Sequence, residues 1–283
     1  MKFSLITSTL GEDRHDKIVR LIHSLIKQKH QDFELIIVDQ NETSKLKVTL
    51  ESYFNEINLI YLKHDQRGVS AGRNFGFRYV SGEIVSFPDD DCWYPDILLM
   101  SVNTWFLNNI NWDALSGCTI DLKKNLTTSR WDKNPGEIHK FNVWRRGITS
   151  SIFLRTYALA NAQGFDETLG PGADSPWQCS DETDYLLNLL SQNKKLYYDP
   201  EVKVYHLEPI TQYDQQALAR AKRYAPGTGR VLKKHSYPFW FVAIALLRPI
   251  LGTLYYATKM QGWRAKFHWL IFQGRLNGWL SSK

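Results

Sequence analysis

The sequence predicts an α/β protein with a mostly parallel central sheet, followed by an amphipathic helical tail. Apolar segments such as 33–39 are short and nearly continuous, which is typical of parallel strands buried on both faces. These segments alternate with stretches whose apolar residues recur at helical spacing. Such alternation indicates right-handed crossover connections. With 283 residues, of which 43% are apolar and 13% aromatic, the chain can bury a sizeable core.

The N-terminal part of the chain is a series of strands, each followed by a helix. Strands are expected at 3–9, 33–39, 57–62 and 83–87. Helices are expected where apolar residues recur between Ile18 and Ile26, near 44–55, at 69–80, and from Pro95 through Leu107.

The pattern changes after the fourth helix. Further strands are expected at 114–122, 147–153, 195–198 and 202–206. The polar, irregular segment 123–146 either faces a substrate or is a long surface excursion. A helix is expected after Ser180, which together with Thr183 fits a capping pattern.

Three consecutive carboxylates, Asp89, Asp90 and Asp91, follow the strand at 83–87. Adjacent acids repel one another, so a positive group is expected beside them. Carboxylate oxygens suit Mg²⁺ or Mn²⁺, which in turn bind diphosphates. The alternative is a solvated acidic turn. The position favours the metal, because open α/β sheets bind ligands at the carboxyl ends of their strands.

Other polar residues are expected at the same edge of the sheet. Thr9 and Asp39 end the first and second strands, and the helix at 69–80 would bring Arg73 nearby. The Arg73 guanidinium either balances the carboxylates, binds a phosphate or forms an ordinary surface ion pair. Neither GxGxxG nor GxxxxGK[ST] follows the first strand, which weighs against a dehydrogenase or a P-loop enzyme.

A second acidic cluster, which contains Asp181, Glu182 and Asp184, opens the helix after Ser180. The helix dipole alone explains acids in a first turn. A carboxylate that projects from a helix start into a cleft is also well placed as a general base. His206 ends the last expected strand, and it is either a metal ligand or a hydrogen-bonded core histidine.

The cysteines and the N-terminal residues indicate the cellular compartment of the protein. Three unclustered cysteines, Cys92, Cys118 and Cys179, argue against a disulfide framework and a zinc site, and favour a reducing cytosol. Glu12 and Asp13 interrupt the N-terminus before a signal-peptide core could form, so no secretion signal is expected.

The net charge of +6 hides an asymmetry between the body and the tail. Residues 216–283 hold twelve Lys or Arg and no Asp or Glu, whereas the remainder holds 23 basic and 29 acidic residues. Within the tail, Arg248-Pro249 is expected to interrupt the apolar run 239–257, so a membrane crossing is disfavoured. Helices that lie on an anionic membrane through 236–283 are favoured over a subdomain that only packs on the body. No nucleic acid is expected, because the aromatic residues cluster with aliphatic ones.

Over roughly residues 1–210, the chain resembles the family 2 glycosyltransferases of bacterial polysaccharide or O-antigen assembly, which have the GT-A fold. Several short motifs carry this resemblance in order. They are Ser8-Thr9, Val38-Asp39, Gly72-Arg73-Asn74, Ser81-Gly82-Glu83, Asp89-Asp90-Asp91, Gly164-Phe165-Asp166-Glu167, the acidic pair before Thr183-Asp184-Tyr185-Leu186, and Val204-Tyr205-His206. The chain departs from the family at Ser8, where proline is usual, and at Leu10-Gly11, where an aromatic residue and Asn are frequent.

The resemblance implies a role for each matching residue. Thr9, Asp39, Arg73, Asp89 and Asp90 would bind the nucleotide sugar. Asp91 would hold Mn²⁺ or Mg²⁺, with Asp89 and, more loosely, His206 beside it. Glu182 would be the catalytic base by position, although the order Asp181-Glu182 reverses the family's usual pair and leaves Asp181 open.

The resemblance also implies the activity and its place in the cell. The chain would be an inverting, metal-dependent transferase that moves a sugar from a nucleoside diphosphate, with UDP expected, to a glycan or lipid-linked acceptor. Residues 1–215 would form the catalytic domain, with a nucleotide-binding half at 1–122 and an acceptor half at 123–215, and residues 216–283 the tail. The protein would be cytoplasmic and peripheral on the inner face of the cell membrane. The alternatives are a sugar-phosphate nucleotidyltransferase and an inactive, membrane-bound nucleotide-sugar-binding protein.

Overall fold

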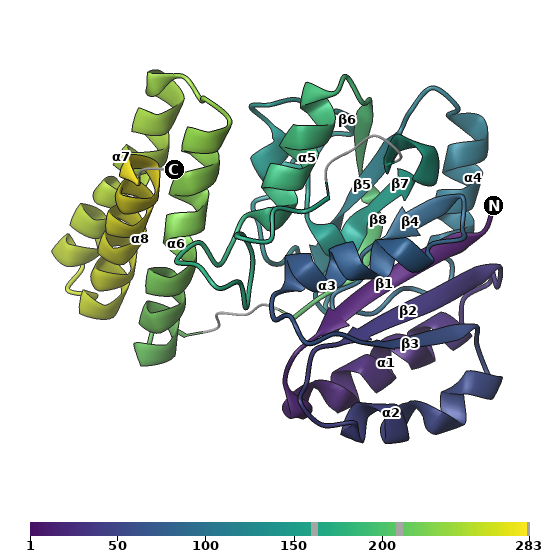
Figure 1. Ribbon diagram of the computed structural model, residues 1–283. Coiled ribbons are helices and arrows are strands. Elements are labelled where there is room, and N and C mark those ends of the chain that lie inside the picture. The colour runs from purple at the N-terminus through teal and green to yellow at the C-terminus, as the bar shows by residue number, and fades with distance from the viewer. Residues whose placement is uncertain (160–163, 208–211, 282–283) are drawn as a thin grey trace.

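The computed structural model describes residues 1–159, 164–207 and 212–281. Its centre is a sheet in the order β3-β2-β1-β4-β7-β5-β8-β6 (Figure 1). The strands are β1 (Phe3–Thr9), β2 (Phe33–Asp39), β3 (Leu59–Lys63), β4 (Ile84–Ser86), β5 (Ala114–Ile120), β6 (Gly136–Glu137), β7 (Ile152–Arg155) and β8 (Leu196–Tyr205). Neighbours pair in parallel except at β7, which runs antiparallel to β4 and β5, and at β6, which runs antiparallel to β8. The predicted mostly parallel sheet is therefore confirmed.

Helices cover both faces of this sheet. They are α1 (His15–Ile26), α2 (Lys45–Leu50), α3 (Val69–Gly76), α4 (Leu98–Asn108) and α5 (Asp181–Ser191). Successive strand residues point to opposite faces, so Leu5 and Leu35 join one core with α1 and α4, while Ile6 and Ile36 join another with α5. The parallel strands β1, β2 and β4 thus end at one edge, where their polar end residues meet.

Two expectations for the second half of the chain are wrong. Thr149–Ser151 forms a 3₁₀ turn, so the strand expected at 147–153 begins only at Ile152. The turn brings the Thr149 hydroxyl to Arg73. The strands expected at 195–198 and 202–206 are one strand, β8, which passes through Pro200 where the register with β5 shifts between Ser116 and Cys118.

The expected capping of α5 by Ser180 is also wrong. Ser180 has the left-handed φ of 67° and makes no side-chain capping bond. Its hydroxyl lies 3.3 Å from the Thr228 hydroxyl instead, on a helix of the tail.

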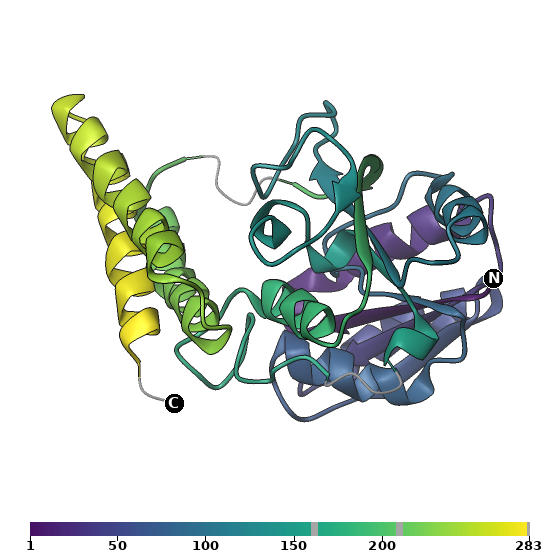
Figure 2. The same cartoon turned by 90° about the horizontal axis from the view of Figure 1, so that it is seen from above.

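The tail consists of three helices, α6 (Gln215–Lys234), α7 (Phe239–Thr258) and α8 (Gly262–Leu280), which stand beside the sheet as a group of their own (Figure 2). The predicted interruption at Arg248-Pro249 is wrong, because α7 continues through it. Pro249 cannot donate a hydrogen bond to the Ala245 carbonyl, four residues earlier. Arg275 of α8 fills that place, since its Nη1 donates to the Ala245 oxygen at 2.8 Å. By length and composition, α7 is apolar enough to cross a membrane.

Candidate functional site

Asp90 and Asp91, just beyond β4, are bound by neighbours from the other strand ends. The Thr9 hydroxyl donates to Asp90 at 2.7 Å. Arg14, which lies between β1 and α1, donates to both carboxylate oxygens of Asp90, and the bond from Nε is 2.5 Å long. Its Nη2 also donates to Asp91 at 2.9 Å. A guanidinium therefore provides the positive group that three adjacent acids require.

Arg73 joins the two acidic clusters. It lies on α3 and only 3% of its surface is exposed. Nη2 donates to Asp89 at 2.8 Å and to the Thr149 hydroxyl at 3.0 Å, while Nη1 donates to Asp181 at 2.6 Å. One guanidinium thus spans from the acids after β4 to the start of α5. The structure brings together side chains that are more than a hundred residues apart in the sequence.

The acids around Arg73 hold their protons unequally. Burial raises the pKa of Asp89 to about 6, although the charge of Arg73 opposes this shift. Burial and the adjacent charge of Asp181 raise the pKa of Glu182 well above its usual value. Arg73 thus contacts Asp181 directly, and Glu182 is the acid beside it whose pKa is raised.

His206, which directly follows β8, lies beside Asp91. Its Nε2 is 3.3 Å from Asp91 Oδ1 and its Nδ1 is 2.7 Å from the Leu207 carbonyl oxygen. Although burial opposes the positive charge, the hydrogen bond to Asp91 and its charge raise the pKa of His206. The same contacts with His206, together with the charge of Arg14, hold the pKa of Asp91 far below its usual value despite burial.

The predicted metal ligands are only partly assembled. Asp91 and His206 are adjacent, and a carboxylate with an imidazole suits Mn²⁺. In the described part of the chain, however, no three His, Cys, Asp or Glu side chains converge on one point that could hold a cation. The pair fits a metal that takes its remaining ligands from a diphosphate and water.

Asp39, at the end of β2, is completely buried. Its oxygens accept from the Tyr61 hydroxyl at 2.6 Å, from the Asn41 backbone at 2.9 Å and from the Asn41 amide at 2.8 Å. Lys63 Nζ lies 3.5 Å away. The carboxylate is thus held firmly at the edge of the sheet, next to the end of β1.

The sequence profile described as glycosyl transferase family 2 matches residues 4–150, more than half of the chain. The chain belongs to glycosyl transferase family 2.

Two relatives have names that refer to poly(ribitol phosphate) or teichoic acid. The poly(ribitol-phosphate) β-N-acetylglucosaminyltransferase TarS of Staphylococcus aureus is 34% identical over 95 residues, which cover 32% of this chain and 16% of TarS. The minor teichoic acid biosynthesis protein GgaB of Bacillus subtilis is 24% identical over 219 residues, which cover 72% of this chain and 23% of GgaB. The chain thus matches less than a quarter of the length of either relative.

Solved structures show the same GT-A fold. The structure of S. aureus TarS 1-349 in complex with UDP has a TM-score of 0.61 at 18% identity, covering 98% of this chain and 91% of that one. The mannosyltransferase PcManGT from Pyrobaculum calidifontis, in complex with GDP-Man and Mn²⁺, has a TM-score of 0.64 at 14% identity, covering 98% of this chain and 86% of that one. The GT-A fold expected for family 2 is confirmed.

Arg14 is the residue of this family 2 site that the sequence did not reveal. It lies in the loop after β1, and no local pattern shows that its side chain reaches acids 76 residues further along the chain. The one available signal was general, namely that three adjacent acids need a positive neighbour.

The tail helix α6 packs against the start of α5, which carries Asp181 and Glu182. Gly227 lies so close to the segment before α5 that a Cβ there would be 2.4 Å from the Cys179 carbonyl oxygen. Asp184 of α5 is fully buried, and it accepts from Lys234 at 2.8 Å and lies 2.7 Å from His235 Nε2. The position of the first turn of α5 therefore depends on the tail.

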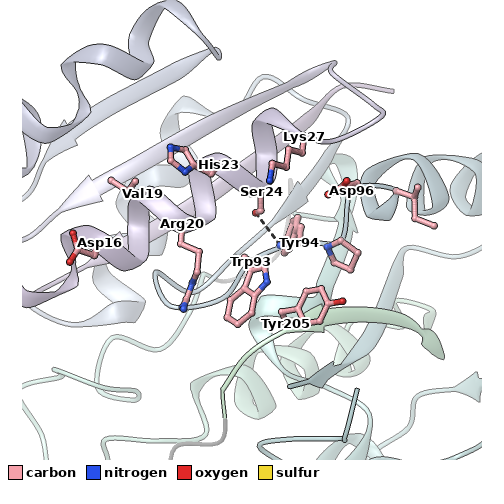
Figure 3. Close-up of a pocket in the computed structure, with 12 residues that line it drawn as sticks. Asp16, Val19, Arg20, His23, Ser24, Lys27, Trp93, Tyr94, Asp96 and Tyr205 are labelled. Atoms are coloured by element: carbon pink, nitrogen blue, oxygen red, sulfur yellow. Dashed lines mark hydrogen bonds between the residues drawn. The ribbon is translucent and has the colours of Figure 1, made fainter. Parts of the chain in front are cut away.

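A surface pocket of about 780 Å³ lies between α1 and the segment 93–97 (Figure 3). None of the predicted site residues lines it. Arg20 connects it to the site, because its guanidinium lies over the Trp93 ring at 4.0 Å and its Nη2 donates to the Asp91 carbonyl at 2.8 Å.

Proposed function

We propose that this protein transfers a sugar from a nucleoside diphosphate donor to a glycan or lipid-linked acceptor in cell-wall or polysaccharide biosynthesis. Membership of family 2 supports the reaction class. The names of the relatives support the setting, since TarS is named as a poly(ribitol-phosphate) β-N-acetylglucosaminyltransferase and GgaB as a minor teichoic acid biosynthesis protein. UDP is the expected nucleotide, because structures similar to this chain contain UDP or UDP-GlcNAc.

The observation that carries this proposal is the Arg73 bridge. It sets Asp89 and Asp181 on either side of one guanidinium, with donor–acceptor distances of 2.8 and 2.6 Å. A donor held at the acids after β4 would therefore present its sugar towards the start of α5. A direct displacement needs this arrangement, with the leaving group on one side of the anomeric carbon and a base on the other.

The donor site would consist of the residues at the strand ends. Asp39 and Thr9 would contact the base and the ribose, while Asp89, Asp90 and Arg73 would lie near the ribose and the phosphates. Asp91, with His206 adjacent and Asp89 nearby, would hold Mn²⁺ or Mg²⁺, which neutralises the charge on a diphosphate leaving group.

Glu182 is the proposed base, with Asp181 as its neighbour. Asp181 is occupied by Arg73 at 2.6 Å, whereas burial and the charge of Asp181 raise the pKa of Glu182. A carboxylate with raised proton affinity takes the proton of an acceptor hydroxyl more readily. Attack from that side would invert the configuration of the sugar without a covalent intermediate.

The proposal also assigns a part in the reaction to each segment of the chain. Residues 1–122 would bind the nucleotide and residues 123–215 the acceptor, together forming the catalytic domain. Residues 216–283 would hold the enzyme at a membrane. The protein would then work in the cytoplasm, on the inner face of the cell membrane.

The exposed face of α7 supports the membrane proposal. Phe239, Trp240, Leu247, Leu251 and Leu254 all have more than half of their surface exposed. The tail carries no acidic residue from 216 onward, so anionic lipid would attract it. Helices of this kind lie in the headgroup region with their apolar face towards the acyl chains.

The transfer reaction is tested with Glu182→Gln. We expect the variant to bind UDP as the wild type does and to lose transfer by about 10²–10⁴-fold, the usual contribution of a general base. The measurement is transfer from a panel of UDP-sugars, with calorimetry of UDP binding as the control. Undiminished transfer would contradict the role of Glu182. Formation of UTP and sugar 1-phosphate from a UDP-sugar and added pyrophosphate, without release of UDP, would indicate a nucleotidyltransferase, and absence of any donor turnover a binding protein.

The membrane proposal is tested by flotation of the full chain with anionic phosphatidylglycerol vesicles. We expect the wild type to float and Leu247→Glu/Leu251→Glu to remain in the bottom fraction. Ile110→Glu is the matched control, because Ile110 is 72% exposed but lies outside the tail. Equal flotation of all three proteins would contradict membrane binding through α7.

A further inference from the structure

We infer that Arg14 is a built-in counter-cation that competes with a divalent metal ion for Asp91, so that the metal binds weakly until an anionic donor draws Arg14 away. The inference rests on the proposed metal-dependent transfer and adds a regulatory part to it. Arg14 is a positioning residue in this scheme, since it acts through the two aspartates.

Arg14 already occupies the place of a cation. Its fork reaches both oxygens of Asp90 and one oxygen of Asp91, and the other oxygen of Asp91 faces His206 at 3.3 Å. Every carboxylate oxygen of Asp90 and Asp91 therefore faces a side-chain nitrogen of Arg14 or His206. A metal ion that binds Asp91 must displace one of these side chains or stand next to it.

Arg14 is the better candidate for displacement than Arg73. The Arg73 side chain is only 4% exposed and is held between acids on both sides. The Arg14 side chain is 27% exposed, and both of its partners lie in the one segment after β4. It can therefore swing outward without leaving an unpaired charge on a second element.

The loop that carries Arg14 is anchored next to the nucleotide side of the site. The Gly11 backbone donates to the Asn41 side chain at 2.6 Å, and Glu12 pairs with Lys45 at 2.7 Å. Asn41 in turn contacts Asp39. A released Arg14 would thus remain beside a bound donor. Its guanidinium could form two parallel hydrogen bonds with the diphosphate, as it can with a carboxylate.

The test is Mn²⁺ binding to the full chain, measured by electron paramagnetic resonance, first without and then with UDP. Without UDP we expect Arg14→Gln to bind Mn²⁺ about tenfold or more tightly than the wild type, because the substitution removes a positive charge that lies 2.9 Å from Asp91 and repels the metal ion. With UDP the difference should shrink, because UDP has already drawn Arg14 from the wild-type site.

Lys17→Gln is the matched control. The charge of Lys17 lowers the pKa of Asp91, as the charge of Arg14 does. Unlike Arg14, however, Lys17 makes no hydrogen bond to Asp91. We expect it to change Mn²⁺ affinity much less than Arg14→Gln does. Equal gains in both variants would indicate a general charge effect and overturn the inference.

The remaining outcomes separate this inference from the proposed function. If the wild type binds Mn²⁺ with UDP and Arg14→Gln binds it no more tightly without UDP, Arg14 does not compete and only this inference fails. If no protein binds Mn²⁺ even with UDP, metal dependence itself fails. If Arg14→Gln does not fold, Arg14→Lys replaces it, because lysine keeps the charge but loses the fork, and unchanged affinity in that variant counts against competition.

Discussion

Replacing Arg73 by Met should destabilise the protein more than any other single charge removal at the site. The substitution leaves the buried Asp181 and the partly buried Asp89 without their common partner. Removing one member of a buried ion pair costs about 3–5 kcal/mol. Two charges about 4 Å apart interact by roughly 4 kcal/mol at the effective dielectric of a protein interior, which is consistent with that range.

The assay for this prediction is denaturant unfolding of the full chain. Arg67→Met is the control, because Arg67 pairs with Glu42 on the surface at 3.0 Å, with exposed side-chain fractions of 63% and 86%. An exposed pair of this kind contributes about 0–1 kcal/mol. Adding Asp181→Asn to Arg73→Met should recover part of the loss, since it removes one of the two unpaired carboxylates. A loss for Arg73→Met no larger than that for Arg67→Met would refute the reasoning.

Three further predictions concern the metal, the base and the tail. Asp91→Asn should weaken UDP binding in the presence of Mn²⁺ but not in its absence, and equal calorimetric affinities for variant and wild type would contradict this. The rate of transfer should rise with pH through the raised pKa of Glu182, because the base works as a carboxylate; Asp181→Asn removes a negative neighbour, so the rise should move to lower pH. Gly227→Ala should cost about 1–3 kcal/mol of stability and lower the transfer rate, because its Cβ would meet the Cys179 carbonyl. Gly262→Ala, where a Cβ meets nothing within 4 Å, should leave both unchanged.

Short-range patterns in the sequence predicted the sheet well. The bounds of β1 and β2 are those expected, because β2 is nearly continuous in apolar residues, β1 is rich in apolar and β-branched residues, and both end in a polar residue. The segment at 147–153 looked like a strand because it is rich in β-branched and small residues. Thr149–Ser151 turns instead, and the turn places the Thr149 hydroxyl where it accepts from Arg73.

Long-range compensation is what local patterns cannot show. Proline predicts a break in α7, and the helix persists only because Arg275, from a different helix, donates to the carbonyl that Pro249 leaves free. The same holds for Arg14, whose contact with Asp90 depends on how the loop after β1 closes over β4. The acids of the site stand out in the sequence, whereas the arginines that bind them depend on the folded chain.

The contacts of Asp184 with Lys234 and His235 have a geometric consequence for the acceptor. They fix α5 to the end of α6, and α7 begins shortly afterwards at Phe239. If α7 rests on lipid, the acidic pair would stand at a constant height above the bilayer. The enzyme would then select acceptors by length, favouring membrane-tethered acceptors whose reactive end reaches that distance from the bilayer.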